Sequence, residues 1–396
     1  MRPLIPVLFA VFLDLIGFGI VIPLLTFYAE EYQASPIHVT LLMACYSAAQ
    51  FLFAPVWGAL SDRMGRRPVM LVSIFASAVF LAGFAAANTL WMLFLFRTLH
   101  GAAAANISTA QACVADITTP ENRAKGMGMI GAAFGIGFTV GPWIGGELSV
   151  FGYAFPIWVA AGLSAINFFL ALRLLPETRK PDSHTRPRPI HPAAFWRVAK
   201  HPVVGLCVVL TFVTTFSFAL MESTFTLFAE HVRALSAAEV GRMFGVAGLV
   251  MVFIQGGLIG RLVKRFGEQN LIPVGIGILA IGLAILPYSP PPVAMTLAFC
   301  VIAIGQGISS PSLHALVSKG TSPDEQGFVL GTNQSMSALA RVVGPTAGGL
   351  LYSGLSPAAP LLTSAGILLV SVGLAVAAMR QRNAHMSSTT NVNASS

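Results

Sequence analysis

Charged residues are scarce in this chain. Only 10% of its 396 residues are Asp, Glu, Lys or Arg, whereas an ordinary soluble domain carries roughly 25%. Hydrophobic residues, in contrast, make up 55% of the sequence. Water is therefore not the main solvent of this protein, and a water-soluble globular domain is excluded as its fold class.

Cysteine is also rare, and motifs for metal or nucleotide binding are missing. The four cysteines, Cys45, Cys113, Cys207 and Cys300, lie in apolar segments without paired or metal-like spacing. We interpret them as small buried hydrophobic residues, and we expect neither a metal site nor a cofactor. No nucleotide-binding P-loop pattern is present, so ATP hydrolysis is not the expected energy source.

Long apolar runs dominate what remains. A membrane-spanning helix needs about 20 mostly apolar residues. The sequence predicts twelve such spans, separated by short polar breaks. They lie near residues 4–28, 39–60, 68–88, 90–113, 127–149, 155–175, 203–229, 239–260, 270–288, 293–316, 328–351 and 358–379. We therefore predict an all-α integral membrane protein, and we treat the first span as a permanent helix because it is too long for a signal peptide.

Basic residues are placed asymmetrically between the predicted loops. Of the 23 Lys and Arg residues, nineteen fall on one side of the membrane once the spans are numbered, and only Arg233 and Arg242 fall on the other. The positive-inside rule then predicts that both termini are cytoplasmic. The net charge of +8 is dispersed over separate loops, which argues against a nucleic-acid partner.

The chain contains an internal repeat. The segment TPENRAKGMG at 119–128 matches SPDEQGFVLG at 322–331, an offset of 203 residues. At the same offset Gly141, Pro142 and Gly145 correspond to Gly344, Pro345 and Gly348. A duplicated six-span unit explains this match, and an even number of spans per unit makes the two copies parallel.

The repeat divides the chain into four predicted parts. These are an N-terminal six-helix bundle at 1–175, a cytoplasmic linker at 176–202, a C-terminal six-helix bundle at 203–380 and a disordered cytoplasmic tail at 381–396. The linker is polar and rich in Pro, and residues 193–200 within it could form a short amphipathic surface helix.

Four short patterns in order resemble the major facilitator superfamily, and within it the twelve-span drug:proton antiporters similar to tetracycline exporters. They are FLDLIGFGIVIPLL at 12–25, GALSDRMGRRP at 58–68, RTLHG at 97–101 and GFTVGPWIGG at 137–146. The resemblance implies that two halves rock about a central cavity, with a small-molecule substrate bound near the membrane midplane. It also implies a bacterial inner-membrane protein, which we expect to be a monomer.

Three charged residues inside predicted spans are candidates for proton coupling. An unpaired charge at the position of Asp14, in the first span, costs about 3 kcal/mol or more, so this carboxyl is expected to face a cavity or to be protonated. Glu222 lies in the seventh span, the repeat equivalent of the first. The alternative for each carboxyl is a hydrogen bond that only joins helices. Arg97 needs an anion, carbonyls or water, and the resemblance implies that it acts on a nearby carboxylate, for which Asp14 is our candidate.

The other motif residues are candidates for packing and gating. Gly137, Gly141, Pro142, Gly145 and Gly146 match the antiporter motif of the fifth span, where small residues let helices approach closely and proline bends the helix. The resemblance implies that this face limits leakage during antiport.

The loop with Asp62, Arg63, Arg66 and Arg67 is a topology anchor. The resemblance adds a gate, in which Asp62 caps a helix of the other half and the arginines pair with Asp116 and Glu121. The second half has Lys264 at the acidic position of this motif, so any such gate is asymmetric.

Uncharged residues supply candidate substrate contacts: Gln50, Asn106, Gln111, Phe218, Gln255, Gln306 and Asn333. The alternative for each is a bond between helices. His100 is expected to be a packed, neutral side chain. No role is assigned to Arg341, for which stabilisation of the interface between the halves is one option.

These observations predict a proton-coupled exporter of a small lipophilic drug or metabolite. Tetracycline itself is doubtful, because spans eight and nine lack the titratable groups expected of a tetracycline exporter. The alternatives are a proton-coupled importer on the same fold, an integral-membrane enzyme and a membrane sensor. The sequence shows no catalytic cluster, which an enzyme would need. Its linker and tail are shorter than the output domain that a sensor would normally carry.

Overall fold

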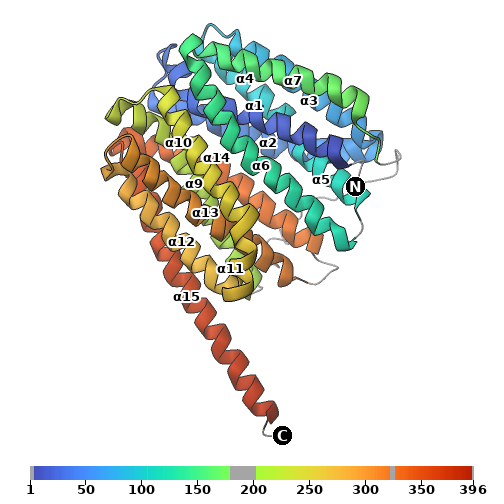
Figure 1. The fold of residues 1–396 in the computed structure, drawn as a ribbon, viewed down its shortest axis with the longest axis vertical. Helices are drawn as coiled ribbons and strands as arrows, with labels where there is room; N and C mark the ends of the chain where they lie inside the picture. The colour runs from blue at the N-terminus through green and yellow to red at the C-terminus, as the bar shows by residue number, and fades with distance from the viewer. Residues whose placement is uncertain (1–3, 105, 119, 179–201, 322–325, 395–396) are drawn as a thin grey trace.

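The computed structural model describes residues 4–104, 106–118, 120–178, 202–321 and 326–394. Within this part of the chain the secondary structure is helical, and ten helices are long and apolar enough to cross a membrane. Two further helical stretches, α4–α5 and α14, occupy the places of the predicted fourth and eleventh spans. The arrangement is therefore consistent with twelve spans (Figure 1).

The helices of the N-terminal half follow the predicted spans closely. They are α1 (Leu4–Glu30), α2 (Pro36–Met64), α3 (Arg66–Ala85), α4 (Leu90–Ala103), α5 (Asn106–Ile117), α6 (Pro120–Leu148) and α7 (Ala154–Leu174), with a short 3-10 turn η1 (Ser149–Phe151). The fourth span is broken between α4 and α5, next to Ala104.

The C-terminal half repeats this order. Its helices are α9 (Pro202–Arg233), α10 (Ala237–Phe253), α11 (Ile259–Phe266), α12 (Glu268–Ile285), α13 (Val293–Lys319), α14 (Gln326–Gly354) and α15 (Ala359–Ala394), with the short turns η2 (Ile254–Leu258) and η3 (Leu286–Tyr288). The turn η2 is a π-helical segment between α10 and α11, so the eighth span also has an irregular middle.

The tail differs from its sequence expectation. Residues 381–394 continue α15 as helix, and Figure 1 shows this end extending away from the bundle. Extension of an existing helix needs no new nucleus, which is the costly step of helix formation. The segment 381–394 is therefore helical, although its polar composition predicted disorder. Most of the linker, including residues 193–200, lies outside the described residues.

Capping groups fix where the helices begin and end. Ser236 accepts a hydrogen bond from the Glu239 backbone N–H, while the Glu239 carboxylate accepts one from the Ser236 N–H at 2.9 Å. This is a capping box at the start of α10. At the end of α3, the Tyr28 hydroxyl donates to the carbonyls of Phe84 and Ala85, both at 3.1 Å. These bonds satisfy carbonyl groups that a helix end leaves without partners.

The repeat is visible in the packing of α6 and α14. A Cβ built on Gly141 of α6 would lie 2.7 Å from Cα of Gly19 in α1, and one on Gly344 of α14 would lie 3.0 Å from Cβ of Ala219 in α9. Each of these helices thus packs closely against the first helix of its own half. Small residues make such approach possible in a membrane bundle, where water does not drive association.

The same two helices also join the halves. A Cβ on Gly146 of α6 would lie 3.0 Å from Cα of Gly241 in α10, and one on Gly349 of α14 would lie 3.3 Å from Cα of Ile37 in α2. Both contacts lie near residues 30–37 and 231–241, which we call the closed end of the bundle. The interface is therefore made of two symmetry-related helix pairs.

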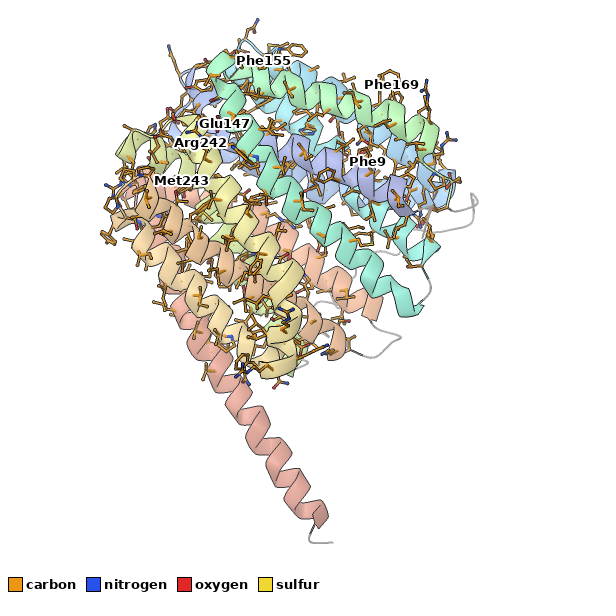
Figure 2. All side chains as sticks on the ribbon, in the orientation of Figure 1. Phe9, Glu147, Phe155, Phe169, Arg242 and Met243 are labelled. Carbon is orange, nitrogen blue, oxygen red and sulfur yellow. The ribbon has the colours of Figure 1, made fainter. Side chains whose placement is uncertain are left out.

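Ion pairs at the closed end add to these contacts. His231 Nε2 lies 2.9 Å from Glu30 Oε1, and the Arg242 guanidinium binds Glu147 at 2.6 Å (Figure 2). Among the ion pairs formed between described residues, these two connect the halves and the remainder lie within one half. At the opposite end, Cβ atoms built on Gly58 and Gly260 would meet nothing within 4 Å.

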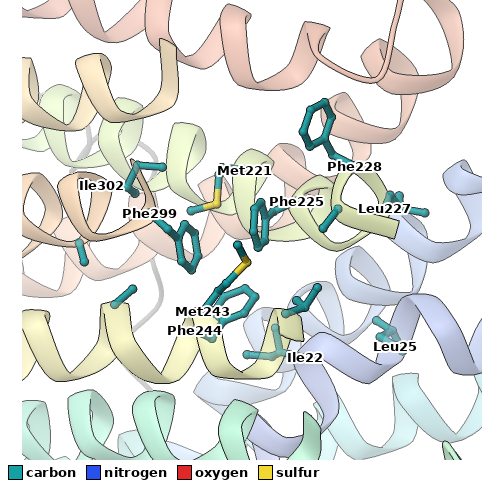
Figure 3. Packing of buried hydrophobic residues seen from close by; sticks show 14 of the residues in the cluster. Ile22, Leu25, Met221, Phe225, Leu227, Phe228, Met243, Phe244, Phe299 and Ile302 are labelled. Carbon is teal, nitrogen blue, oxygen red and sulfur yellow. The ribbon is translucent and has the colours of Figure 1, made fainter. Parts of the chain in front are cut away.

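Aromatic packing fills the core next to the closed end (Figure 3). The Phe225 and Phe299 rings stack with centroids 4.6 Å apart, and Phe244 packs edge-on against Phe299 at 4.9 Å. These rings come from α9, α13 and α10. The stacked and edge-on geometries are those that aromatic pairs prefer.

Candidate functional site

A cavity lies between the two halves near the middle of the bundle. Its empty volume is about 650 Å³, including the part open to solvent. Its lining is polar and apolar in mixture: Val11, Asp14, Leu15, Phe18, Tyr46, Ser47, Gln50, Ser77, His100, Ala104, Ser164 and Arg341. A concave surface that combines apolar side chains with a few convergent polar groups is typical of a small-molecule site.

Asp14 is placed as its charge requires. The carboxylate lines the cavity, and Oδ1 accepts a hydrogen bond from Asn167 Nδ2 at 2.9 Å. Asn167 of α7 also donates to the Ala10 carbonyl of α1 at 2.9 Å. The amide therefore fixes the Asp14 side chain against its own helix, at the wall of the cavity.

Arg97 has a different environment from the expected one. It is 2% exposed, and its guanidinium lies over the Tyr46 ring at 4.4 Å and the Phe18 ring at 5.8 Å. No carboxylate of the described residues lies within ion-pairing distance of it, so the expected Arg97–Asp14 pair is not formed in this conformation. Tyr46 and Phe18 both line the cavity, which places Arg97 behind an aromatic wall.

Glu222 does not line the cavity but belongs to the same electrostatic system. It is partly buried in α9, and the charged groups that act on it are Arg341 and Arg97. Asp14, Arg97 and Arg341 all act on Tyr46. Asp14, Arg97 and Arg341, from spans of both halves, therefore act on one ring, and Glu222 interacts with the two arginines of this group.

The candidate substrate residues divide into three groups. Gln50 lines the cavity and donates to the Ala104 carbonyl at 3.1 Å. Gln306 Oε1 and Asn333 Oδ1 are buried and have no hydrogen-bond partner among the described residues. The remaining members are placed elsewhere or not at all: Phe218 packs toward Phe138 with centroids 6.3 Å apart, Gln111 lies in α5, Gln255 lies in the π-helical turn, and the Asn106 side chain is outside the described part.

The loop between α2 and α3 forms a network around Arg66. Its guanidinium pairs with Asp62 at 2.9 Å and Asp116 at 3.0 Å, so the predicted arginine–Asp116 pair is present. Arg67 donates to the Leu172 carbonyl, and Arg63 is exposed. The Glu121 side chain lies outside the described residues.

The helix that follows this loop, α3, is capped by a carboxylate. Glu177 accepts hydrogen bonds from the backbone N–H groups of Arg66 and Arg67, at 2.8 and 3.2 Å. A carboxylate at a helix N-terminus satisfies free N–H groups and complements the helix dipole. The cap of α3 thus comes from the end of the same half.

The glycines of the antiporter motif serve two contacts. Gly137, Gly141 and Gly145 are four residues apart and face α1, where Cβ atoms would lie within 2.5–2.7 Å of Leu15, Gly19 and Ile20 atoms. Gly146 faces α10 instead. Pro142 lies inside the continuous helix α6 between these positions.

Two helical halves with a cavity lined by residues of both are the arrangement expected of a transporter. Comparison of the sequence with known families identifies which family this is. The family model described as Major Facilitator Superfamily matches residues 7–345 and 258–394. The chain belongs to the Major Facilitator Superfamily.

Individual relatives within the superfamily agree with this. The class C tetracycline resistance protein of Escherichia coli is 32% identical over 351 residues, which cover 86% of this chain and 87% of that protein. Multidrug resistance protein 2 of Bacillus subtilis is 27% identical and covers 94% of both chains. Both are similar over nearly their whole length.

Solved structures in the superfamily share the fold. The human organic anion transporter MFSD10 (TETRAN) is 26% identical, covers 94% of this chain and 99% of its own, and has a TM-score of 0.73. The nucleoside transporter NupG has a TM-score of 0.75 at 16% identity, covering 96% of this chain and 99% of its own. The latter likeness concerns the fold alone.

Some residues of the site were not among the sequence candidates. Tyr46 and Asn167 were not selected, and Arg341 was left without a role. Tyr46 lies four residues before Gln50 and so shares its helix face. Asn167 is a lone amide in the apolar segment 155–175, which was the available signal for a polar contact in the membrane.

Proposed function

We propose that this chain is a proton-coupled exporter that moves a small, largely apolar compound through the cavity between its halves. The observation that carries the proposal is Asp14, a carboxyl inside the first span that lines this cavity and is held by Asn167. A carboxyl in a space open to water can exchange a proton, and it can also bind a polar group of a substrate. Competition between the two couples their movements.

The conformation supports alternating access. The ion pairs between the halves and the Gly146–Gly241 contact lie at the closed end, whereas Gly58 and Gly260 at the other end have open space beside them. With the topology predicted from the basic residues, the closed end is the outer side of the inner membrane and both termini are cytoplasmic. The cavity then faces the cytoplasm, where an exporter loads its substrate.

The substrate class follows from the lining and from the relatives. Apolar side chains such as Leu15 and Phe18 alternate with a few polar ones. The names of the relatives refer to tetracycline and multidrug resistance, which supports an amphiphilic drug or metabolite. We expect a single chain to suffice, because both halves of the cavity come from one polypeptide.

The loop around Arg66 supports a gating role at the inner side. Arg66 pairs with Asp62 and Asp116 in this conformation. Rocking of the halves toward each other at this end would bring the loop against the second half. The buried, satisfied state of Arg66 is then one of two arrangements of these charges.

Transport into inverted membrane vesicles tests the proposal. With an imposed pH gradient, a panel of tetracycline, ethidium and 2-naphthoate should include a compound that the vesicles accumulate while releasing protons. Asp14→Asn should abolish this exchange and Glu222→Gln should lower it, whereas Glu31→Gln, at an exposed position of the closed end, should leave it unchanged. Native exchange rates in both Asp14→Asn and Glu222→Gln would contradict the assignment. Uptake into intact cells instead of export would favour the importer.

A further inference from the structure

Arg341 is the contribution of the C-terminal half to the cavity lining. It lies in the middle of α14, and the other lining residues belong to α1, α2, α3, α4 with its C-cap Ala104, and α7. A guanidinium keeps its charge under all physiological conditions. A permanent positive charge from one half therefore faces a surface made by the other half.

This guanidinium has no direct partner in the part of the chain that the structure describes. It donates no hydrogen bond to, and forms no ion pair within 4 Å of, any residue that the structure describes. Glu222 acts on it only at longer range. Two buried arginines differ, since Arg66 is paired with Asp62 and Asp116, and Arg97 is covered by the rings of Tyr46 and Phe18.

An unpaired arginine inside a span needs compensation. A charge in the membrane interior is costly, and water or an anion in the cavity must offset this cost. None of the Arg341 nitrogens belongs to the buried polar atoms that lack a partner. The guanidinium is thus accessible from the cavity rather than sealed in the protein.

The neighbouring groups suit an acid with an apolar body. Ser47, Ser77 and Ser164 supply hydroxyl donors in the same cavity. Phe18 and Leu15 supply apolar surface beside them. Asp14 is also present, but Asn167 holds its Oδ1, so the two opposite charges can receive different parts of one ligand.

We propose that Arg341 forms an anion subsite, so that the cavity selects organic carboxylates or sulfonates that carry an aromatic or aliphatic body. The guanidinium fork binds the acidic group through two N–H donors, a geometry that a carboxylate matches well. The proposal rests on the proposed function in one respect, that the cavity is the substrate site.

Binding of matched probes to the purified full-length protein in detergent tests this subsite. The probes are 2-naphthoate, 2-naphthalenesulfonate and methyl 2-naphthoate, which share the ring and differ in charge. Equilibrium dialysis gives their affinities without a pH gradient. We expect the two anions to bind at least tenfold more tightly than the ester.

Variants assign the preference to Arg341. Arg341→Gln should remove the difference between acid and ester, and Arg341→Lys should keep part of it because the charge remains. Arg265→Gln removes the same charge at an exposed position and should behave as the native protein. If Arg341→Gln fails to fold, the acid–ester contrast in the native protein and in Arg341→Lys still decides.

Two results would overturn the subsite. One is equal affinity of the native protein for acid and ester, and the other is an unchanged contrast in Arg341→Gln. The test is separate from that of proton exchange. Arg341-dependent binding without proton-coupled transport would refute the proposed function and leave the subsite standing. Proton-coupled transport of uncharged compounds alone would refute the subsite and leave the proposed function standing.

Discussion

Gly146 of α6 and Gly241 of α10 meet across the two halves of the protein. A Cβ built on Gly241 would lie 2.9 Å from Cα of Gly146 and 2.5 Å from the Pro142 carbonyl oxygen. Two backbones this close leave no room for a side chain. The contact is therefore specific to the conformation in which this end of the bundle is closed.

Substitution at this contact should shift the conformation. Gly241→Ala places a methyl group between the halves, and rocking at the closed end can relieve the clash without unfolding either half. We expect a cysteine introduced at Thr40, which is buried beside Gly349, to react faster with a water-soluble thiol reagent in this variant. The four native cysteines are replaced by serine for this measurement. Gly366→Ala, which has open space around it, is the control, and equal labelling in both variants would contradict the expectation.

The packing of α6 on α1 gives a prediction about stability. Gly141→Ala brings a methyl group to 2.7 Å from Cα of Gly19 within one half, where rocking cannot relieve it. Overpacking of this kind costs about 1–3 kcal/mol. Thermal unfolding in detergent, followed by tryptophan fluorescence, should show a lower midpoint than in the native protein.

Gly131→Ala is the matched control for this helix. The methyl group that this change adds would meet nothing within 4 Å, and alanine favours a helix over glycine by about 1 kcal/mol. Its midpoint should equal or exceed the native value. The same loss of stability in both variants would show that helix composition, and not contact with α1, decides.

Arginine removal in the α2–α3 loop should depend on the position. Arg66→Ala leaves Asp62 and Asp116 without their shared cation, whose side chain is only 6% exposed. Removal of one partner from a buried ion pair costs about 3–5 kcal/mol. Arg63→Ala removes the same charge from an exposed site in this loop and should change the unfolding midpoint little. Equal losses would argue against the network.

The ring of Tyr46 should matter more than its hydroxyl group. Arg97 lies 4.4 Å from the ring centroid in a desolvated place, where a cation–π contact contributes about 2 kcal/mol. Tyr46→Phe keeps the ring and should retain native stability and probe binding. Tyr46→Leu should lose both, measured by thermal unfolding and by equilibrium dialysis. A larger loss in the phenylalanine variant would assign the role to the hydroxyl instead.

The sequence by itself determined the class of fold. We predicted two parallel six-helix units from the twelve apolar runs, the offset repeat and the glycine spacing in the fifth span. A long apolar run forms a helix in the membrane because a helix gives its backbone N–H and C=O groups hydrogen-bond partners within the segment. The spacing of Gly137, Gly141 and Gly145 even predicted a close-packed helix face, since every fourth residue of a helix points the same way. Asp14 was found by the same logic, as a charge in an apolar run.

Tertiary structure alone decided which polar groups meet. Arg97 was expected beside Asp14, but its guanidinium lies over the rings of Tyr46 and Phe18. The Asp14 carboxylate instead accepts a hydrogen bond from Asn167 of α7. Arg341 enters the N-terminal surface of the cavity from a helix of the other half. Residues as far apart in sequence as Asp14 and Asn167 carry no local signal of their contact, because the facing of each helix is set by how all the helices pack together.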